Sequence, residues 1–188
     1  MERNWTLPHY EKMLETNAEL LEALSLLYQR TKTPELRTVL DKTVAYLTTA
    51  LARPGGGFWG SQDSDGEEAY YRLPLAERAK KEQPFIYKTV YCEWNGLALR
   101  GLATAWRATG NQACKAALEE TVPFLLKECW KDGAGFCRSF DSAGAQTFGL
   151  LLDNVQAGFG LLAASIAFEK PEWLAHARAT ADFVLGHF

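Results

Sequence analysis

The chain repeats itself, and this self-similarity constrains its fold more than any other feature. Residues 55–66 and 133–144 are identical at seven of twelve positions, at an offset of 78 and without a gap. The same offset relates Asn17 to Asn95 upstream. Self-similarity at a constant spacing is the signature of a repeat architecture.

A third copy follows the second at an offset of 59, which places Asn154 on Asn95 and Thr180 on Thr121. The two offsets differ because the loops between the units differ in length. We therefore predict one domain, residues 1–188, that contains three units at about 9–66, 93–144 and 153–188.

Each unit is predicted to be a pair of helices. The first helices are expected at 9–30, 93–109 and 153–168, and the second helices at 34–52, 112–130 and 171–187. Pro34 and Pro171 fall where a first-turn proline is tolerated. Pro123 falls inside a predicted helix and should kink or break it.

The two kinds of helix differ in hydrophobic pattern. The later first helices are apolar or small nearly all round, as at 97–106 and 155–166, and such helices are buried on all sides. The second helices are amphipathic, as at 34–47. We expect an all-α fold of stacked hairpins, either a solenoid or a closed α/α toroid, with inner first helices. The long loops and the inner-helix N-termini then share one face, which suits a binding site.

Composition excludes several function classes. The chain has 188 residues and a formal net charge of -3, whereas a nucleic-acid-binding protein normally shows a basic excess. No apolar run approaches the roughly 20 residues that span a bilayer. The first residues lack the apolar stretch of a signal peptide, so we expect a cytoplasmic protein without a membrane partner.

The four cysteines are Cys92, Cys114, Cys129 and Cys137. None forms a CxxC pair, which argues against a zinc ribbon or a thioredoxin-type redox centre. We interpret them as free buried thiols in a reducing compartment and expect neither a metal nor a cofactor.

Three segments resemble a known family. They are Trp5-x-x-Pro-His-Tyr-Glu-Lys-Met-Leu-x-x-Asn-Ala18, Gly56-Gly-Phe-x-x-Ser-Gln-Asp-Ser-Asp65 and Trp94-Asn-Gly-Leu97. Together they resemble the family that includes spermatogenesis-associated protein 20, in which a thioredoxin-like domain is fused to a helical toroid. That toroid resembles the six-hairpin α/α toroids of glycosidases and N-acylglucosamine 2-epimerases. The resemblance implies half of an (α/α)6 toroid and a role in carbohydrate processing.

The N-terminal segment offers the first candidate site residues. In an epimerase-like toroid His9 would act as general base or acid, Glu11 would line the site, and a sugar would stack on Trp5. The alternative is a capping segment in which Glu11 favours the first helical turn and His9 bonds a loop. We favour the alternative, because no second histidine shares this face.

The acidic loop after Trp59 offers a second group. Asp63 and Asp65 could supply a glycosidase carboxylate or bind calcium, but Asp and Ser also make tight turns by bonding nearby amides. Asp63 recurs as Asp141, which favours a structural role. Asp65 is replaced by Ala143 in the copy and is the better substrate-binding candidate.

The starts of the inner helices carry Asn17, Asn95 and Asn154, each shortly after an acid, namely Glu15, Glu93 and Asp153. Recurrence favours helix caps. Three acids on one rim could also line a pocket, and Glu93 and Asp153 are the preferred catalytic carboxylates. Trp59 and Trp94 could stack on sugar rings or pack the loops onto the core.

Two functions remain open at this stage. The first is a carbohydrate-binding or carbohydrate-processing toroid, and the second is a non-catalytic helical assembly module. The sequence does not decide whether the protein is an enzyme. Apolar flanks on the first and third units predict a homodimer, in which two three-hairpin halves could complete a six-hairpin ring.

Overall fold

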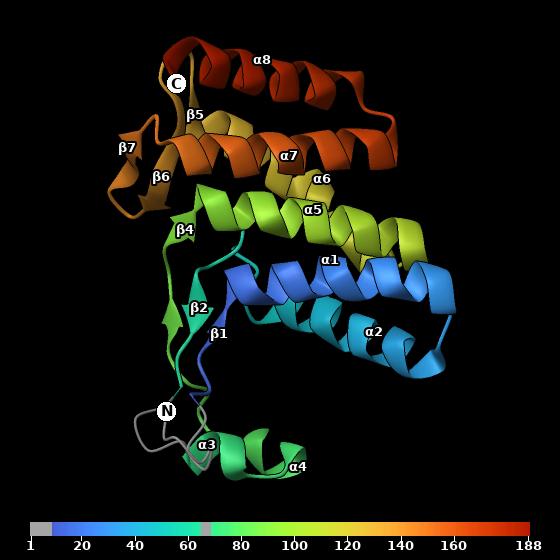
Figure 1. Cartoon of the computed structure of the whole chain (residues 1–188). Helices are drawn as coiled ribbons and strands as arrows, with labels where there is room; N and C mark the ends of the chain where they lie inside the picture. The colour runs from blue at the N-terminus through green and yellow to red at the C-terminus, as the bar shows by residue number, and fades with distance from the viewer. Residues whose placement is uncertain (1–8, 65–68) are drawn as a thin grey trace.

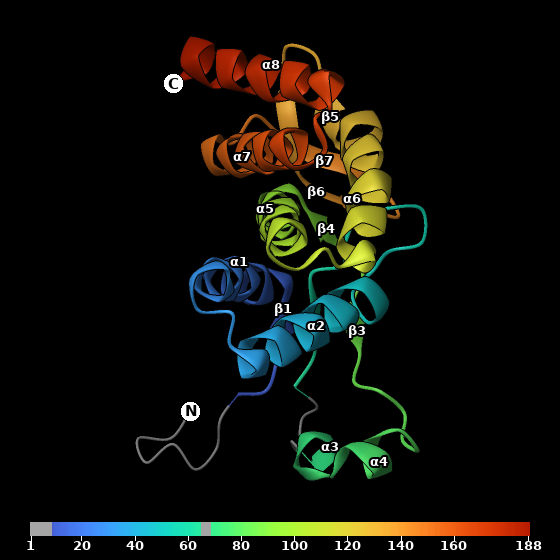
Figure 2. The ribbon, with the colours of Figure 1, turned by 90° about the vertical axis from the view of Figure 1, so that its right-hand side faces the viewer.

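The computed structural model describes residues 9–64 and 69–188, and it shows three antiparallel helix pairs stacked side by side (Figure 1). The inner helices are α1 (Leu14–Thr31), α5 (Cys92–Thr109) and α7 (Leu151–Phe168). The outer helices are α2 (Pro34–Thr49), α6 (Gln112–Phe124) and α8 (Pro171–His187). Figure 2 shows α1, α5 and α7 one above another, with α2 and α6 along one side of the row. The predicted hairpin stack is confirmed.

The inner helices approach one another closely because glycines lie at their contacts. A Cβ atom added to Gly96 would lie 2.4 Å from the backbone of Gln156 on α7, and one added to Gly101 would lie 2.6 Å from the Ala18 carbonyl of α1. Helix α5 is therefore buried on both sides, whereas α1 and α7 are each covered by one inner neighbour. The outer helices bury only a stripe, as at Leu40, Val44 and Leu47 of α2. These burials support the predicted order of inner and outer helices.

Several predicted boundaries were wrong for identifiable reasons. Helix α1 begins at Leu14 and not at residue 9, because Lys12–Met13 form strand β1. Helix α2 ends at Thr49 and not at residue 52. The helix predicted over 112–130 changes shortly after Pro123 into a π-helical turn, η1 (Leu125–Cys129). Proline removes a backbone donor and disturbs the regular ladder, as expected.

The long loops are not irregular but form two small antiparallel sheets at one end of the stack (Figure 1). The first sheet contains β1, β2 (Ser61–Gln62) and β3 (Ile86–Tyr87). The second contains β4 (Val90–Tyr91), β5 (Trp130–Lys131), β6 (Gly135–Asp141) and β7 (Gly144–Phe148). The sequence analysis expected helices and loops alone, so these strands are an addition to the predicted fold.

The two loops are the same hairpin with different tips. Met13 pairs with Ser61 in the first, and Tyr91 pairs with Ser139 in the second, 78 residues later. The return strands also match, since Ser61 pairs with Tyr87 and Ser139 with Gln146. The first tip is expanded to residues 63–85 and includes α3 (Ala69–Arg72) and α4 (Leu75–Arg78), whereas the second is a tight turn. The offset therefore changes from 78 to 59 at this insertion.

Two of the three recurring asparagines, Asn95 and Asn154, hold these loops, and none of the three caps its own helix. Asn95 Oδ1 accepts from the Phe58 amide at 2.8 Å, and Asn154 Oδ1 accepts from the Phe136 amide at 2.8 Å. The helix-capping interpretation was wrong for Asn17, Asn95 and Asn154, because each side-chain amide donates instead to the carbonyl four residues earlier. Each later inner helix thus fastens the loop of the preceding unit.

A glycine precedes each clamped phenylalanine. Gly57 and Gly135 have φ values of 83° and 76°, in the left-handed region that favours glycine. Phe58 and Phe136 are both buried, as predicted from the repeat.

One helix of the described residues, α7, is long and apolar enough to cross a membrane, with a mean hydropathy of 1.4. It is also the inner helix between α5 and α8, and core helices commonly share this composition.

Candidate functional site

Arg138 gathers the two preferred carboxylates at the N-terminal ends of the inner helices. Its Nη1 atom donates to Glu93 Oε2 at 2.6 Å and to Asp153 Oδ1 at 3.2 Å. Glu93 lies in the first turn of α5, Asp153 in the first turn of α7, and Arg138 on β6. We call these three residues the rim triad. Two acids predicted from the sequence are therefore brought within reach of one guanidinium.

Asp153 is the least satisfied polar group of the described residues. Its side chain is 0% exposed, and its Oδ2 atom is the one buried side-chain nitrogen or oxygen in 9–64 and 69–188 that lacks a hydrogen-bond partner. Burial raises the pKa of this carboxyl, although Arg138 opposes the shift. Its Oδ1 atom also accepts from the Glu93 amide at 3.3 Å. Asp153 thus bonds a first-turn amide of the neighbouring helix and leaves one oxygen open.

Arg138 interacts unequally with the two acids. The hydrogen bond to Glu93 raises the pKa of the Arg138 guanidinium, which marks Glu93 as its principal partner. The Glu93 side chain is 9% exposed. One guanidinium therefore serves two carboxyl groups, and its contact with Glu93 is the shorter of the two.

A third acid extends the rim to α1. Burial, and then the negative charge of Glu93, raise the pKa of Glu15 in the first turn of α1. The inner helices thus each contribute one acid to this end of the stack: Glu15, Glu93 and Asp153. The rim predicted from the sequence is present, and its charges interact.

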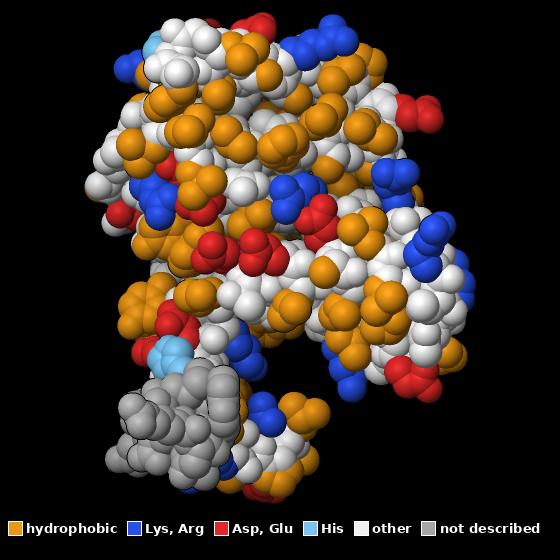
Figure 3. Space-filling model, in the orientation of Figure 1, with side chains coloured by type: hydrophobic (Ala, Val, Ile, Leu, Met, Phe, Trp, Pro, Cys, Tyr) orange, Lys and Arg blue, Asp and Glu red, His pale blue; other side chains and the backbone are white. Residues whose placement is uncertain are grey.

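The exposed side of the inner helices also carries a polar band. Arg100 of α5 bonds Glu22 of α1 at 2.7 Å and Gln156 of α7 at 3.3 Å. Figure 3 shows this side, with hydrophobic side chains over α7 and α8 and charged side chains where α5 lies against α1. The polar band continues from the rim along the helices.

The N-terminal candidates form a separate group. His9 bonds Glu11 Oε2 at 3.1 Å, and Glu11 Oε1 accepts from the Ser61 hydroxyl at 2.8 Å. The imidazole of His9 is 58% exposed. His9 and Glu11 therefore bond each other, and Glu11 bonds strand β2. The expected capping segment differs in detail, because Glu11 precedes the first turn of α1 and His9 bonds Glu11 instead of a loop.

The remaining candidates contribute less to a site. Trp5 and Asp65 lie outside the described residues. Trp59 and Trp94 are half-buried and pack against the hydrophobic core, and Trp94 contacts the ring of Tyr91 at 4.6 Å between centroids. Their packing agrees with the structural alternative.

The recurring aspartates also behave as turn residues. Asp63 accepts from the Ser64 amide at 2.6 Å, and Asp141 accepts from the Ala143 amide at 2.8 Å. The favoured structural role of Asp63 is supported by these contacts.

Two features of this region were not predicted from the sequence. Arg138 was overlooked, although the repeat places it opposite Gly60 and thereby marks it as a departure. Three of the four cysteines, all buried, converge although they are far apart in the chain. Neither Arg138 nor the group of three cysteines belongs to a short sequence motif.

The chain is similar in sequence to a known human protein over part of its length. No protein-family model matches it. Over 85 residues it is 32% identical to spermatogenesis-associated protein 20 of Homo sapiens, and 30% identical to that of Mus musculus. The match covers 40% of this chain and 11% of each relative. The resemblance inferred from the motifs is confirmed at this level.

The fold is similar to that of six-hairpin carbohydrate enzymes. Cellobiose 2-epimerase from Spirochaeta thermophila matches with a TM-score of 0.74 and 16% identity, over 90% of this chain and 42% of that structure. D-mannose isomerase matches with 0.72 and 16%, over 95% and 41%. Unsaturated glucuronyl hydrolase from Bacillus sp. GL1 matches with 0.72 and 14%, over 95% and 47%. The chain thus has the fold of about half of an (α/α)6 toroid.

Proposed function

We propose that the rim triad binds a sugar and provides acid–base groups for acting on it. The observation that carries this proposal is Asp153, a fully buried carboxyl with one unpartnered oxygen at the loop face. An unpaired buried polar atom is costly, so such a group is usually explained by a partner that completes it. The carbohydrate enzymes that share the fold support a sugar hydroxyl as that partner.

The environments of the two acids suggest different roles. Glu93, held by Arg138, would accept a hydrogen bond or a proton from a sugar hydroxyl. Asp153, whose pKa burial raises, would act as the proton donor. Glycosidases commonly divide the acid and base roles between two carboxyl groups. His9, bonded to Glu11 at the start of α1, is proposed as a further proton-transfer group for a ligand that reaches that part of the face.

Ligand-observed NMR against D-mannose, N-acetylglucosamine and cellobiose tests the proposal. We expect saturation transfer to at least one sugar, and its loss in Asp153→Asn and Arg138→Lys. Glu172→Gln, on the exposed part of α8, is the control and should bind as the wild type does. Absence of transfer to all three sugars, or equal transfer in all variants, would contradict a sugar site at the rim triad.

The alternative function, helical assembly, is supported by one other surface. A groove of about 410 Å³ lies between α7 and α8, and the exposed residues Phe159 and Ile166 lie on α7. By the repeat, this flank corresponds to the α5 side on which α7 itself packs. A second copy could therefore dock its α1 hairpin there, and two copies would supply six hairpins.

Sedimentation of the purified chain at micromolar concentration tests the proposed homodimer. We expect a two-chain species that Phe159→Glu converts to monomer, because the substitution places a charge in an apolar contact. The exposed Leu75→Glu on α4 is the control for a surface charge away from this flank. A wild-type monomer of 21.0 kDa would contradict the dimer.

A cytoplasmic location is also proposed. All four cysteines are free, and thiols persist in reducing compartments. Fractionation of the source cells with an antibody to the chain would test it, and recovery in an oxidising compartment would contradict it.

A further inference from the structure

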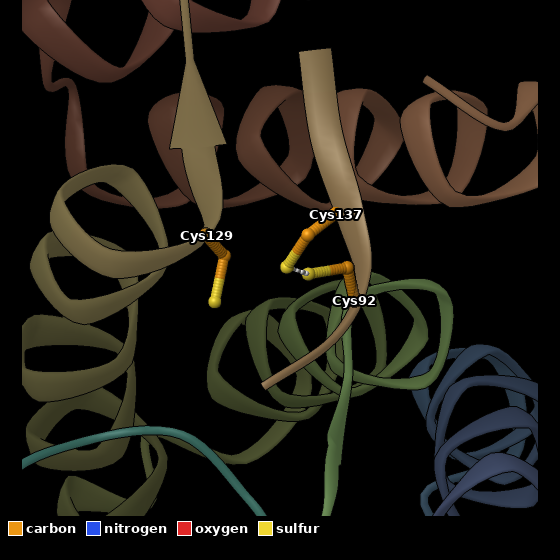
Figure 4. A group of neighbouring side chains, drawn as sticks. All are labelled: Cys92, Cys129 and Cys137. Carbon is orange, nitrogen blue, oxygen red and sulfur yellow. Dashed lines mark hydrogen bonds between the residues drawn. The ribbon is translucent and has the colours of Figure 1, made fainter. Parts of the chain in front are cut away.

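Three cysteine side chains meet inside the second unit (Figure 4). Cys92 is the first residue of α5, Cys129 the last residue of η1, and Cys137 lies on β6. Their sulfur atoms all lie within 4.8 Å of one another, and the Sγ atoms of Cys92 and Cys137 are 3.5 Å apart. All three residues are 0% exposed. We call them the thiol cluster.

The first unit shows what the same positions contain when they only pack. At an offset of 78, the thiol cluster corresponds to Leu14, Leu51 and Trp59, which belong to or pack on the hydrophobic core. Apolar side chains are therefore sufficient for this fold at these positions. In the second unit all three positions are cysteines, and their sulfur atoms converge.

The separations fit a shared metal ion. Sulfur atoms bound at about 2.3 Å to one tetrahedral ion lie about 3.8 Å apart, and those of a planar three-coordinate ion lie slightly further apart, at about 4 Å. Thiolates select soft ions such as Cu(I) and Zn(II).

We propose that Cys92, Cys129 and Cys137 form a three-thiolate site for a thiophilic metal ion. No fourth cysteine, histidine or carboxylate joins them among residues 9–64 and 69–188. Structural Zn(II) is almost always four-coordinate, whereas Cu(I) accepts three thiolates, so the donor set favours Cu(I). The ion would displace the thiol protons and would tie α5, η1 and β6 together.

The site adjoins the rim triad along the chain. Cys92 precedes Glu93, and Cys137 precedes Arg138, so each chain segment contributes one residue to each group. A bound ion would therefore fix the two segments that position the Glu93–Arg138 ion pair. This inference does not depend on sugar binding.

The test is a competition titration of the reduced, metal-free chain under nitrogen. Cu(I) is supplied from its bathocuproine disulfonate complex and Zn(II) from its pyridylazoresorcinol complex. We expect one Cu(I) per chain, a thiolate-to-metal absorption band in the ultraviolet, and a rise in Tm. Zn(II) should be retained more weakly. Retention of Zn(II) in preference to Cu(I) would overturn the assignment of the site to Cu(I).

Three variants locate the binding. The double variant Cys92→Leu/Cys129→Leu restores leucines found in the first unit and should lose binding at least 100-fold. Should it fail to fold, Cys137→Ser removes one ligand with minimal change in size and should show the same loss. Cys114→Ser alters a buried cysteine of α6 outside the cluster and should bind as the wild type does.

Three results would overturn the proposal. The first is the absence of any retained ion in the reduced wild type. The second is equal binding by the cluster variants and the wild type. The third is a disulfide between Cys92 and Cys137 that reductants remove only after denaturation, because it would leave no thiolate pair for an ion.

Discussion

The first and second long loops share a scaffold and differ in their chemistry. Both contain a left-handed glycine and a buried phenylalanine whose amide is held by an asparagine of the next inner helix. Among the positions at which the two units differ, Leu14, Leu51, Trp59 and Gly60 correspond to Cys92, Cys129, Cys137 and Arg138. Residues that recur in both units thus hold the fold. The departures supply Arg138 of the rim triad and all three residues of the thiol cluster, whereas Glu93 of the rim triad recurs as Glu15.

The largest expected loss of stability comes from a substitution that disrupts the loop structure shared by the two units. In Gly135→Ala the new Cβ would lie 2.4 Å from Asn154 Oδ1 and 2.6 Å from the Phe183 ring, at a φ of 76°. We expect a loss of about 3 kcal/mol in the free energy of unfolding, from overpacking and backbone strain together. Denaturant titration measures it.

Gly133→Ala is the matched control. It has a φ of 74° but no atom within 4 Å of the new Cβ, so strain alone should cost about 1 kcal/mol. Gly57→Ala should resemble Gly135→Ala, because its Cβ would lie 2.7 Å from the Phe124 ring. Equal costs at Gly133 and Gly135 would contradict the tight packing of the loop.

The next prediction compares the three recurring asparagines by the loop backbone groups that each one bonds. Asn95 bonds both the amide and the carbonyl of Phe58, Asn154 bonds only the amide of Phe136, and Asn17 has neither contact. Alanine substitution should cost about 3, about 2 and less than about 1 kcal/mol respectively, because buried backbone groups are left unpaired. Thermal or denaturant unfolding measures the series. Equal costs at all three positions would support helix capping instead.

A smaller effect concerns the charge state of the rim. Burial raises the pKa of folded Asp153 above the unfolded value of 3.8, so its proton stabilises the fold at low pH. That stability is lost as the pH rises through the folded pKa. Asp153→Asn has no carboxyl at this position and therefore does not lose this stability as the pH rises. The free energy of unfolding of Asp153→Asn, relative to that of the wild type, should increase by up to about 1 kcal/mol between about pH 4 and about pH 7.

Unfolding curves across that pH range, with Glu172→Gln as an exposed control, measure the difference. A relative stability of Asp153→Asn that falls as the pH rises would contradict the raised pKa. It would show that the carboxylate is stabilised by Arg138 more than it is penalised by burial.

The smallest expected effect concerns the loop tips. Asp63→Ala and Asp141→Ala each remove an acceptor for a nearby backbone amide in an accessible turn. Each substitution should lower the free energy of unfolding by about 0.5 kcal/mol or less, because surface substitutions rarely cost more than this. A loss above about 2 kcal/mol in Asp63→Ala alone would show that the expanded first tip has a role that its copy lacks.

The helices and their order could be predicted because their signals extend over many residues. The all-round apolar pattern of 155–166 indicated an inner helix, and the repeat fixed the register of all three units. Two-residue strands such as β1 carry no periodic signal, so the start of α1 was placed too early. The asparagines were visible as a repeat, but their partners lie in another unit and were not.

The site could be predicted only in part. Glu93 and Asp153 were selected for their place at the inner-helix N-termini, and Arg138 was in principle detectable as a charge where the first unit has Gly60. The thiol cluster was not detectable from spacing. Its convergence depends on the pairing of β5 with β6 and on the π-helical turn after Pro123, which bring Cys129 and Cys137 to the start of α5.

The central claim is that the recurring asparagines and glycines hold the fold, while Arg138, a departure from the repeat, is required to bind the ligand. Thermal unfolding of Arg138→Gly, with and without the sugar that binds the wild type, tests it most directly, because glycine is the residue of the first unit at this position. The account predicts a Tm within a few degrees of the wild type without sugar, and no rise on adding it. A sugar-dependent rise equal to that of the wild type would contradict the claim, as would an Arg138→Gly chain that fails to fold.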